Sequence, residues 1–244
     1  MYMHPVYSYS VRFIPPRASA QGARPSPDGL CFFWISLVRT YVYVDAFNLY
    51  YGCLRNTPYR WLNLDEFCRR MLPPNDVQCI KYFTAHVGAR PTDPDQPSRQ
   101  QLYLRALRTL PRVEIHLGHY LSHAVSMPLA HPPATGSRFV QVMKTEEKGS
   151  DVNLATHLVS DAYENLFDVA VIVSNDSDLL APVNIVSKRL GKKVGILNPQ
   201  QHPAFVHKQA ATFFKQIRQG VLRDSQFPPV LTDAAGTFHK PSSW

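Results

Sequence analysis

The stretch Val169-Ala-Val-Ile-Val-Ser-Asn-Asp-Ser-Asp178 decides the fold, because five consecutive apolar residues run directly into two carboxylates. A short, unbroken apolar run rich in β-branched residues is typical of a strand buried on both faces, as in a parallel sheet covered by helices. In open sheets of this kind, the side chains that do chemistry collect beyond the carboxyl ends of the strands. The stretch therefore predicts an α/β fold, with Asp176 and Asp178 at its functional edge.

On either side of this stretch, strand-like and helix-like patterns alternate. Apolar runs typical of strands occur at Tyr41–Asp45, Gln78–Thr84, Val113–Leu117, Val169–Ser174 and Lys193–Leu197. Apolar residues at helical spacing occur at Leu64–Met71, Ser98–Leu110, Asp151–Asn165, Leu179–Leu190 and Ala204–Ile217. This alternation predicts a three-layer α/β sandwich with a central, mainly parallel sheet. Prolines and a glycine interrupt it over residues 119–143, which favours a surface excursion or hairpin between two short strands.

The composition indicates one globular domain flanked by two tails. The chain has 244 residues, of which 45% are hydrophobic. Residues 1–38 are rich in Pro, Ser, Arg and Tyr without periodicity, so we interpret them as a poorly ordered leader; one hypothesis is that the native protein starts further in, near Val38. The domain is predicted to span residues 39–218, and residues 219–244 form a proline-containing tail that we do not expect to be helical.

Charge and apolar content bear on partners and location. A formal net charge of +8 favours a polyanionic partner without identifying it. The longest apolar stretch near the start, Leu30–Val38, is about half of what a bilayer-spanning helix needs, so we expect no membrane association. The cysteines lack the Cys-x-x-Cys spacing of a metal knuckle and lie in or beside apolar segments, which indicates buried free thiols and a cytoplasmic protein: Cys31, Cys53, Cys68 and Cys79.

Two further segments bring acidic side chains to the same edge of the predicted sheet. One predicted strand ends in Asp45, and a helix begins near Asn48; Asp151 opens the helix that precedes the strand beginning at Val169. Four carboxylates near one crevice would repel one another strongly unless a cation neutralised them. The sequence therefore predicts a Mg²⁺ or Mn²⁺ site formed by Asp45, Asp151, Asp176 and Asp178.

A divalent cation at that edge would supply chemistry on a phosphodiester. It can polarise a phosphoryl oxygen and lower the pKa of a bound water, so that hydroxide attacks near neutral pH. Asn48 could orient the phosphate or a metal-bound water without adding negative charge. Helix capping is the alternative for Asp151 and for one of residues 175–177, whereas Asp45, at the end of a buried strand, has no obvious capping role.

Substrate contacts are predicted less sharply. Ser174 and Lys148 are candidates, although Lys148 could equally be an ordinary solvated lysine. Phe47, Tyr50 and Tyr51 could stack bases, but aromatic residues at this spacing more often belong to the core. Basic residues that could form a rim for phosphate lie in segments where exposed lysines are routine: Lys144, Lys188, Arg189, Lys192, Lys193, Lys208, Lys215 and Arg218.

Three stretches together resemble a known family. YVYVDAFNLYY (41–51), KGSDVNLATHLVSDAYENLFDVAVIVSNDSDLLAPVN (148–184) and RLGKKVGIL (189–197) are similar to NYN domains, a branch of the PIN-like nucleases, and the resemblance covers about residues 40–215. It implies a parallel sheet and a divalent-metal ribonuclease site, with Asp45, Asp151, Asp176 and Asp178 around the metal and Asn48 assisting. The family often has glycine beside the paired aspartates, where this chain has Asn175 and Ser177.

The primary hypothesis is thus a metal-dependent endoribonuclease that acts on RNA. An alternative from another class is a non-catalytic RNA-binding or regulatory module on the same fold, although an acidic pocket repels phosphate when no metal is present. A third is a phosphoryl-transfer domain of the receiver or phosphatase type, which would require a lysine or threonine at particular strand ends that the sequence does not convincingly provide. The RNA target, a homo-oligomer and a regulatory protein partner stay open.

Overall fold

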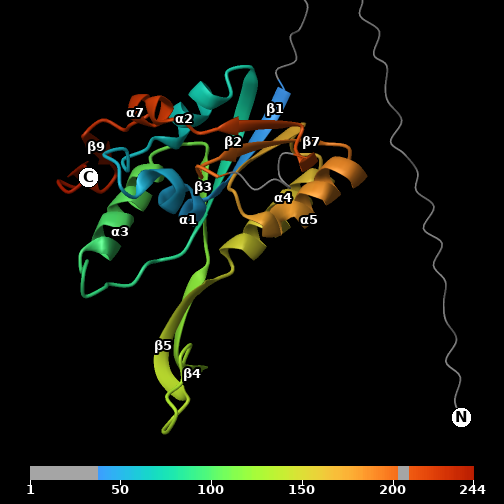
Figure 1. Ribbon diagram of the computed structural model, residues 1–244. Coiled ribbons are helices and arrows are strands. Elements are labelled where there is room, and N and C mark those ends of the chain that lie inside the picture. The colour runs from blue at the N-terminus through green and yellow to red at the C-terminus, as the bar shows by residue number, and fades with distance from the viewer. Residues whose placement is uncertain (1–37, 203–208) are drawn as a thin grey trace, which may run out of the picture. The chain divides into compact units, whose positions relative to one another are not determined.

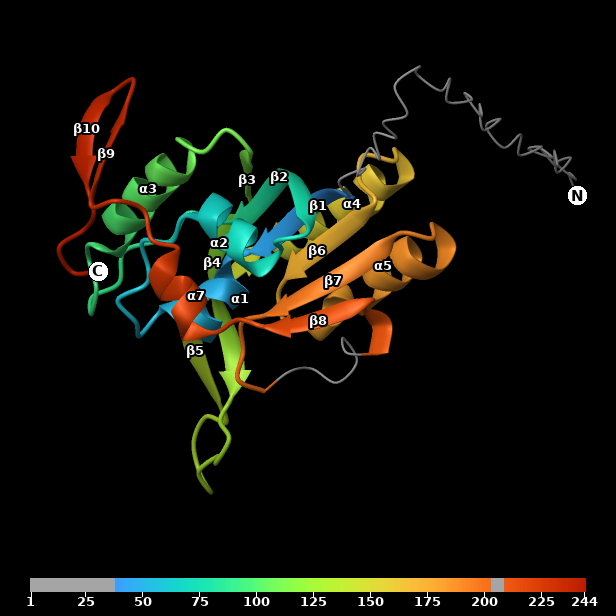
Figure 2. The same cartoon turned by 90° about the horizontal axis from the view of Figure 1, so that it is seen from above.

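A computed structural model describes residues 38–202 and 209–244, and Figures 1 and 2 show it from two directions. Apart from Val38, the predicted leader lies outside these residues, as does Cys31. Within the described ranges, the central sheet has the order β3-β2-β1-β6-β7-β8 and every neighbouring pair is parallel. Its strands are β1 (Val38–Asp45), β2 (Asn75–Thr84), β3 (Val113–Leu117), β6 (Val169–Val173), β7 (Lys193–Asn198) and β8 (Phe213–Gln216).

Helices cover both faces of this sheet, as Figure 2 shows. One face carries α1 (Ala46–Leu49), a π-helical turn η1 (Tyr50–Leu54), α2 (Leu64–Met71) and α3 (Gln96–Leu107). The other face carries α4 (Ser150–Tyr163), a 3₁₀ turn η2 (Ser177–Leu179), α5 (Leu180–Asn184) and a π-helical turn η3 (Ile185–Arg189). Alternate strand residues feed two cores: Val42 and Val171 pack on the first face, and Tyr43 and Ile172 on the second. The predicted three-layer α/β sandwich is confirmed.

The strand order reverses between β1 and β6. From β1 the chain moves outward to β2 and β3, then returns to place β6 on the other side of β1. In such sheets, the crevice at the carboxyl ends of the two strands that flank the reversal is where ligands bind. Asp45 ends β1, and Ser174 directly follows β6, so the acidic segments meet at this point.

The segment predicted as an excursion or hairpin is a long antiparallel hairpin. Its strands, β4 (His119–Pro128) and β5 (Phe139–Lys148), pair from His119 with Lys148 to Pro128 with Phe139. They are longer than the sequence pattern indicated, and the hairpin projects away from the sandwich (Figure 1). Tyr120 pairs directly with Glu147, and directly opposed residues of two antiparallel strands lie on the same face, so both share one face of the hairpin.

The helix predicted over Ala204–Ile217 is wrong at its end. Phe213–Gln216 forms the edge strand β8, parallel to β7. The physical reason lies in the neighbouring strand: Gly195 has no side chain, and a Cβ placed there would lie only 2.0 Å from Cζ of Phe213. The phenyl ring therefore occupies a slot that only glycine leaves open, and tertiary pairing overrides the local helical spacing. The part of that prediction at residues 203–208 lies outside the described residues.

Residues 219–244 also differ from expectation, because they include the short helix α7 (Gln219–Asp224). The prolines that argued against a helix come after it, and Leu222 supplies a buried contact for this turn. A hairpin of β9 (Val230–Asp233) and β10 (Gly236–His239) follows. It is tied to α3 by Arg105, whose guanidinium donates to both carboxylate oxygens of Asp233 at 2.7 Å.

The cysteines and the helix lengths relate to two expectations from the sequence, buried free thiols and no membrane association. Cys53, Cys68 and Cys79 are free thiols; Cys68 and Cys79 are buried and Cys53 is half-buried. None of the helices among the described residues is long and apolar enough to cross a membrane.

Candidate active site

Asp45 is fixed at the carboxyl end of β1 by two hydrogen bonds. The residue is only 6% exposed to solvent. Oδ1 accepts from the backbone N–H of Asn48 at 2.9 Å, so Asp45 caps α1, a role that the sequence did not suggest. Oδ2 accepts from the hydroxyl of Ser174 at 2.9 Å. Both carboxylate oxygens are therefore held in place by neighbours from two different strand ends.

Ser174 and Asn48 join the loop after β1 to the loop after β6. The hydroxyl oxygen of Ser174 also accepts from the backbone N–H of Asp176 at 3.0 Å. The side-chain oxygen of Asn48 accepts from the backbone N–H of Asn175 at 3.1 Å. Both residues thus position carboxylates. Asp176 in turn caps the 3₁₀ turn η2, because its Oδ1 accepts from the N–H of Asp178 at 3.0 Å.

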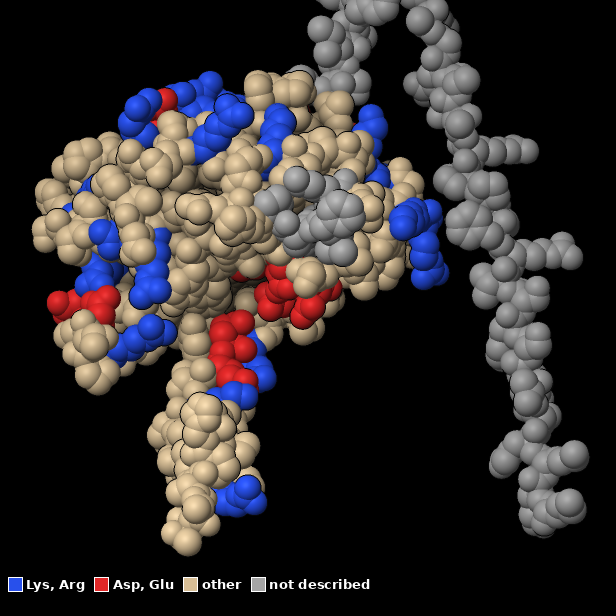
Figure 3. All heavy atoms as spheres, viewed as in Figure 1, with Lys and Arg blue, Asp and Glu red and all other residues tan. Residues whose placement is uncertain are grey.

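Four carboxylates line one pocket at this edge: Asp45, Glu147, Asp151 and Asp176. Three of the four predicted aspartates are thereby brought together. Asp178 is exposed and is not among the residues that line the pocket, although its charge contributes to the raised pKa of Asp151. Figure 3 shows acidic side chains gathered where the hairpin leaves the body of the domain.

Glu147 is the carboxylate that sequence reasoning missed. It lies near the end of β5, and its Oε1 and Oε2 accept from the backbone N–H and the hydroxyl of Ser150 at 3.1 and 2.7 Å. The sequence signal available for Glu147 was its position three residues before the first residue of a helix. Whether its side chain faces the pocket depends on the register of the hairpin, which the sequence did not specify. Lys148, the next residue, points to the other face of β5, where its Nζ lies 3.2 Å from Glu146 Oε2. It does not line the pocket.

Burial and mutual repulsion raise the pKa of two of these carboxyls. Burial is the main cause at Asp45, and Asp176 adds to it, while hydrogen bonds from Asn48 and Ser174 act in the opposite direction. Asp151 is exposed as a residue, but partial desolvation of its carboxyl is still the largest cause, followed by the charges of Asp45, Asp176, Glu147 and Asp178, and together they raise its pKa to about 6. The carboxylates of the pocket thus repel one another, and binding of a proton or a cation reduces this repulsion.

The donor set fits Mg²⁺ or Mn²⁺ in a loosely held mode. Across residues 38–202 and 209–244, no three His, Cys, Asp or Glu side chains are grouped closely enough to hold a metal ion by themselves. The cage of four aspartates expected from the sequence is therefore not preassembled. Mg²⁺, however, usually keeps several waters and takes one or two carboxylates plus substrate phosphates. A pocket of carboxylate oxygens with a raised Asp151 pKa suits that mode.

The basic rim expected from the sequence does not surround this pocket. Lys193 begins β7, so it and the nearby Lys188, Arg189 and Lys192 lie toward the amino ends of the strands, opposite the carboxylates. Lys144 pairs with Glu146 at 2.5 Å on the hairpin, and Lys208 lies outside the described residues. The cation that does line the pocket is Arg90, which the sequence did not single out.

Aromatic side chains form the rest of the pocket wall. Phe47, Tyr51 and Tyr120 all line it, and the rings of Phe47 and Tyr120 meet edge to face at 6.0 Å. Tyr51 is 44% exposed, so it is not the core residue that its spacing favoured. Tyr50, by contrast, is half-buried against the core. The hairpin face that carries Tyr120 and Glu147 thus supplies one side of the pocket.

The raised pKa of Asp151 gives a prediction that needs no substrate. Since its pKa is about 6 in the folded protein against 3.8 as the ordinary value, the ionised carboxyl opposes folding, and this penalty is complete above pH 6 and vanishes toward pH 4. With chelator present, Asp151→Asn should therefore stabilise the protein at pH 8 by about 1 kcal/mol, a value reduced for solvent screening, and by almost nothing at pH 4.

Urea unfolding at both pH values measures this, with Asp224→Asn as the control, because Asp224 is exposed and pairs with Arg223 at 2.8 Å. Added Mg²⁺ should stabilise the wild type more than Asp151→Asn. A variant that is less stable than the wild type at pH 8 without cation would show that the carboxylates do not repel one another as described.

The family model described as NYN domain matches residues 39–218. A relative from Pseudomonas putida (strain DSM 28022 / S16), described as 6-hydroxy-3-succinoylpyridine 3-monooxygenase HspA, is 31% identical over 236 residues, which is 85% of this chain and 75% of the relative. A crystal structure of a protein of unknown function from Vibrio parahaemolyticus RIMD 2210633 is similar with a TM-score of 0.49 and 20% identity, covering 75% of this chain and 94% of that one.

Proposed function

The chain belongs to the NYN domain family, whose fold is nuclease-like, and from this premise we propose that it is a metal-dependent endoribonuclease that cleaves RNA phosphodiester bonds. One observation carries the proposal: four carboxylates, one of them with a pKa raised to about 6, line a single pocket at the reversal of the strand order. Family membership supplies the reaction class, and the pocket supplies residues suited to it.

One or two of the carboxylates of Asp45, Asp151, Asp176 and Glu147 would hold Mg²⁺ or Mn²⁺ directly, and the others would attract it through bound water. Such a cation polarises a phosphoryl oxygen and lowers the pKa of a bound water. Asp45 is preorganised for this task, because Asn48 and Ser174 fix its two oxygens. Asn48 and Ser174 act as positioning residues that keep the loops after β1 and β6 in register.

Other pocket residues suit the rest of an RNA strand. The guanidinium of Arg90 would offset phosphate charge beside the carboxylates, and arginine matches phosphate geometry with paired N–H donors. Phe47, Tyr51 and Tyr120 present ring surfaces on which bases can stack. An acidic centre with a basic and aromatic surround attracts a polyanion only when a cation is bound, so RNA binding and cation binding should be coupled.

A second candidate follows from the Pseudomonas relative, whose 31% identity extends over 85% of this chain. It is insertion of one oxygen atom of O₂ into a hydroxypyridine, while two electrons from a reductant and two protons convert the other oxygen atom to water. Incubation with 6-hydroxy-3-succinoylpyridine, O₂ and an external two-electron reductant tests it directly: substrate-dependent consumption of O₂ with an oxygenated product would favour this reaction over RNA cleavage.

Total cellular RNA provides the test of the main proposal. With Mn²⁺, the wild type should generate new RNA ends that sequencing can map, and chelator or Asp176→Asn should suppress them by about 100-fold. Asp224→Asn, at an exposed ion pair, should cut like the wild type. If the folded wild type leaves varied RNAs intact with Mn²⁺, the protein is not a ribonuclease. In that case, RNA binding that is equal with and without Mg²⁺ would indicate the non-catalytic RNA-binding module instead.

A further inference from the structure

The hairpin of β4 and β5, which we call the hairpin arm (residues 119–148), carries much of the exposed apolar surface. Six of the twelve large apolar side chains that are exposed among the described residues lie in this arm: Leu121, Met127, Leu129, Phe139, Val140 and Met143. The two strands pack on each other, and Figure 1 shows them projecting away from the sandwich. An isolated two-stranded hairpin is at best marginally stable in water, so the arm is incomplete by itself.

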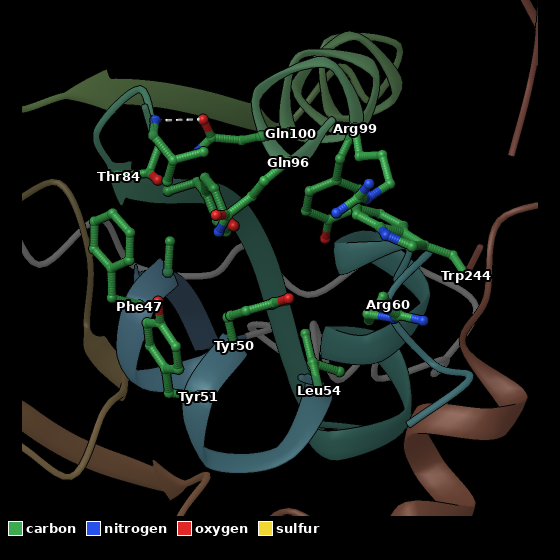
Figure 4. Close-up of a pocket in the computed structure, with 14 residues that line it drawn as sticks. Phe47, Tyr50, Tyr51, Leu54, Arg60, Thr84, Gln96, Arg99, Gln100 and Trp244 are labelled. Carbon is green, nitrogen blue, oxygen red and sulfur yellow. Dashed lines mark hydrogen bonds between the residues drawn. The ribbon is translucent and has the colours of Figure 1, made fainter. Parts of the chain in front are cut away.

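The body of the domain, in contrast, closes one of its own hollows. Side chains from α1, η1, α3 and Trp244 converge between the helical segment from Ala46 to Leu54 and α3 (Figure 4). They leave a cavity of about 70 Å³, which is room for a few water molecules and too little for a planar organic ligand. This hollow needs no partner, whereas the hairpin arm does.

The outer edge of β5 is open for pairing with a further strand. The backbone N–H of Leu129 donates to the carbonyl of Arg138 at 2.9 Å, so the even-numbered residues of β5 direct their backbone groups toward β4. The odd-numbered residues, such as Gln141 and Met143, then direct theirs outward. Phe139–Met143 contains no charged residue and no proline, which are the features that usually protect a strand edge. This stretch is therefore suited to hydrogen bonding with another chain.

Charge indicates what kind of strand fits this edge. Between Ala124 and Met143, Arg138 is the only lysine, arginine, aspartate or glutamate, so the outer part of the arm lacks the cluster of cations that phosphate binding requires. Arg138 is exposed, and no acidic side chain of the described residues pairs with it. A partner strand should therefore place a carboxylate opposite Arg138 and an apolar side chain opposite Val142.

Strand β5 of a second copy meets both requirements when it pairs antiparallel about Val142. Arg138 of each copy then lies opposite Glu146 of the other copy, and the two Val142 side chains lie opposite each other. Moving the twofold axis by one residue in either direction would instead place Arg138 opposite a lysine, Lys144 or Lys148. The charges of β5 thus select one register.

We propose that two copies of this chain pair through the outer edges of β5 and form a twofold-symmetric dimer. The two hairpin arms become one four-stranded sheet in the order β4-β5-β5-β4, and a single face of it gathers apolar side chains of both copies: Val125, Met127, Val140 and Val142. Such an isologous interface uses the same surface on both copies and gives a closed dimer. The pairing does not depend on the reaction.

The register also fixes the distance between the two acidic pockets. Glu147, which lines the pocket, lies five residues from Val142 along β5. At about 3.4 Å per residue, the two Glu147 residues of the dimer lie about 34 Å apart along the sheet. Each copy therefore works with its own pocket.

Sedimentation velocity of the full chain over a concentration series tests the dimer. The wild type should sediment with the mass of two chains. Arg138→Glu and Glu146→Arg should each raise the dissociation constant of the dimer by about 10-fold or more, because like charges then face each other twice in every dimer. An equimolar mixture of the two variants should dimerise like the wild type, since each variant presents the charge that the other requires.

A cross-link tests the register. Because the backbone groups of Val142 face β4, the two Val142 residues form a pair without hydrogen bonds, whose Cα atoms lie about 4.5 Å apart, within the range of a disulfide. With a mild oxidant, Val142→Cys should therefore form a covalent dimer. Val230→Cys is the matched control, because Val230 is a 46% exposed strand residue outside the arm, and it should form no such dimer.

Four results would overturn the proposed dimer. They are a wild type that stays monomeric at every concentration, a mixture of the two charge variants that does not recover dimers, assemblies that keep growing beyond two chains, and cross-linking of Val142→Cys that is no faster than that of Val230→Cys. Thermal melting verifies that the variants are folded. Since none of these measurements uses RNA, their outcome leaves the proposed ribonuclease activity untouched.

Discussion

Asp45→Asn is expected to lower the rate of RNA cleavage by about 100-fold or more while the domain stays folded. The remaining amide oxygen can still accept from the N–H of Asn48 and cap α1, so the local backbone keeps its main support. The substitution removes the negative charge of a buried carboxylate whose two oxygens are fixed by hydrogen bonds at the centre of the site. Because burial and Asp176 raise the pKa of Asp45, losing that charge should not reduce stability without cation.

Initial rates on a labelled single-stranded RNA with Mn²⁺ give the measurement, and thermal melting in chelator accompanies it. Asp224→Asn again provides an exposed aspartate outside the pocket. An Asp45→Asn protein that melts like the wild type and cuts at the wild-type rate would remove Asp45 from the chemistry.

The second large effect concerns stability and a buried ion pair behind the site. Asp161→Ala is expected to cost about 3–5 kcal/mol of unfolding free energy, because it leaves the buried ammonium group of Lys81 with only a distant and exposed acidic partner, Glu114, at 4.0 Å. Lys81 and Asp161 are 7% and 5% exposed, and Lys81 Nζ lies 2.6 Å from Asp161 Oδ2. The hydroxyl of Tyr43 donates to the same carboxylate oxygen at 2.7 Å. The pair fastens α4, which carries Asp151 at its start, to strands β1 and β2.

Urea unfolding measures this cost, and two further variants define its origin. Asp168→Ala breaks the exposed pair with Arg39 and should cost no more than about 1 kcal/mol. The double variant Lys81→Met with Asp161→Leu should recover most of the loss, because two apolar side chains replace two buried charges. A double variant as unstable as Asp161→Ala would show that packing at α4, rather than an unpaired charge, accounts for the loss.

Much of the sheet could be predicted because local pattern and tertiary environment agree there. The strand Val113–Leu117 has the predicted bounds, because a short β-branched run suits a strand of the sheet. The helix Leu64–Met71 also has the predicted bounds, because its amphipathic pattern suits a helix packed on a sheet face. The edge strand Phe213–Gln216 could not be predicted in this way. Its spacing is helical, and what makes it a strand is a slot beside Gly195, some residues away in the chain.

The residues of the candidate site fall into the same two groups, those that local pattern predicts and those that it does not. Asp45 ends one strand and Asp176 comes shortly after another, and these two strands are neighbours in any sheet of this order, so topology alone brings the two residues together. Glu147, Tyr120 and Arg90 lie in a hairpin and a loop, where placement depends on register and chain direction that local patterns do not specify. Lys148 was a candidate because it stands immediately before Gly149 and close to Asp151 in sequence, and the alternation of β5 turns it away from the pocket, toward Glu146.

Mn²⁺ binding, followed by the loss of the free-ion electron paramagnetic resonance signal, tests the shared cation most directly. The account predicts saturable binding to the wild type, and affinity at least about 10-fold lower in Asp45→Asn, Asp151→Asn and Glu147→Gln alike, because each of the three carboxylates adds to the negative charge that attracts the ion, whether it contacts the ion directly or through a bound water. Binding that is the same in the wild type and in all three variants would contradict it.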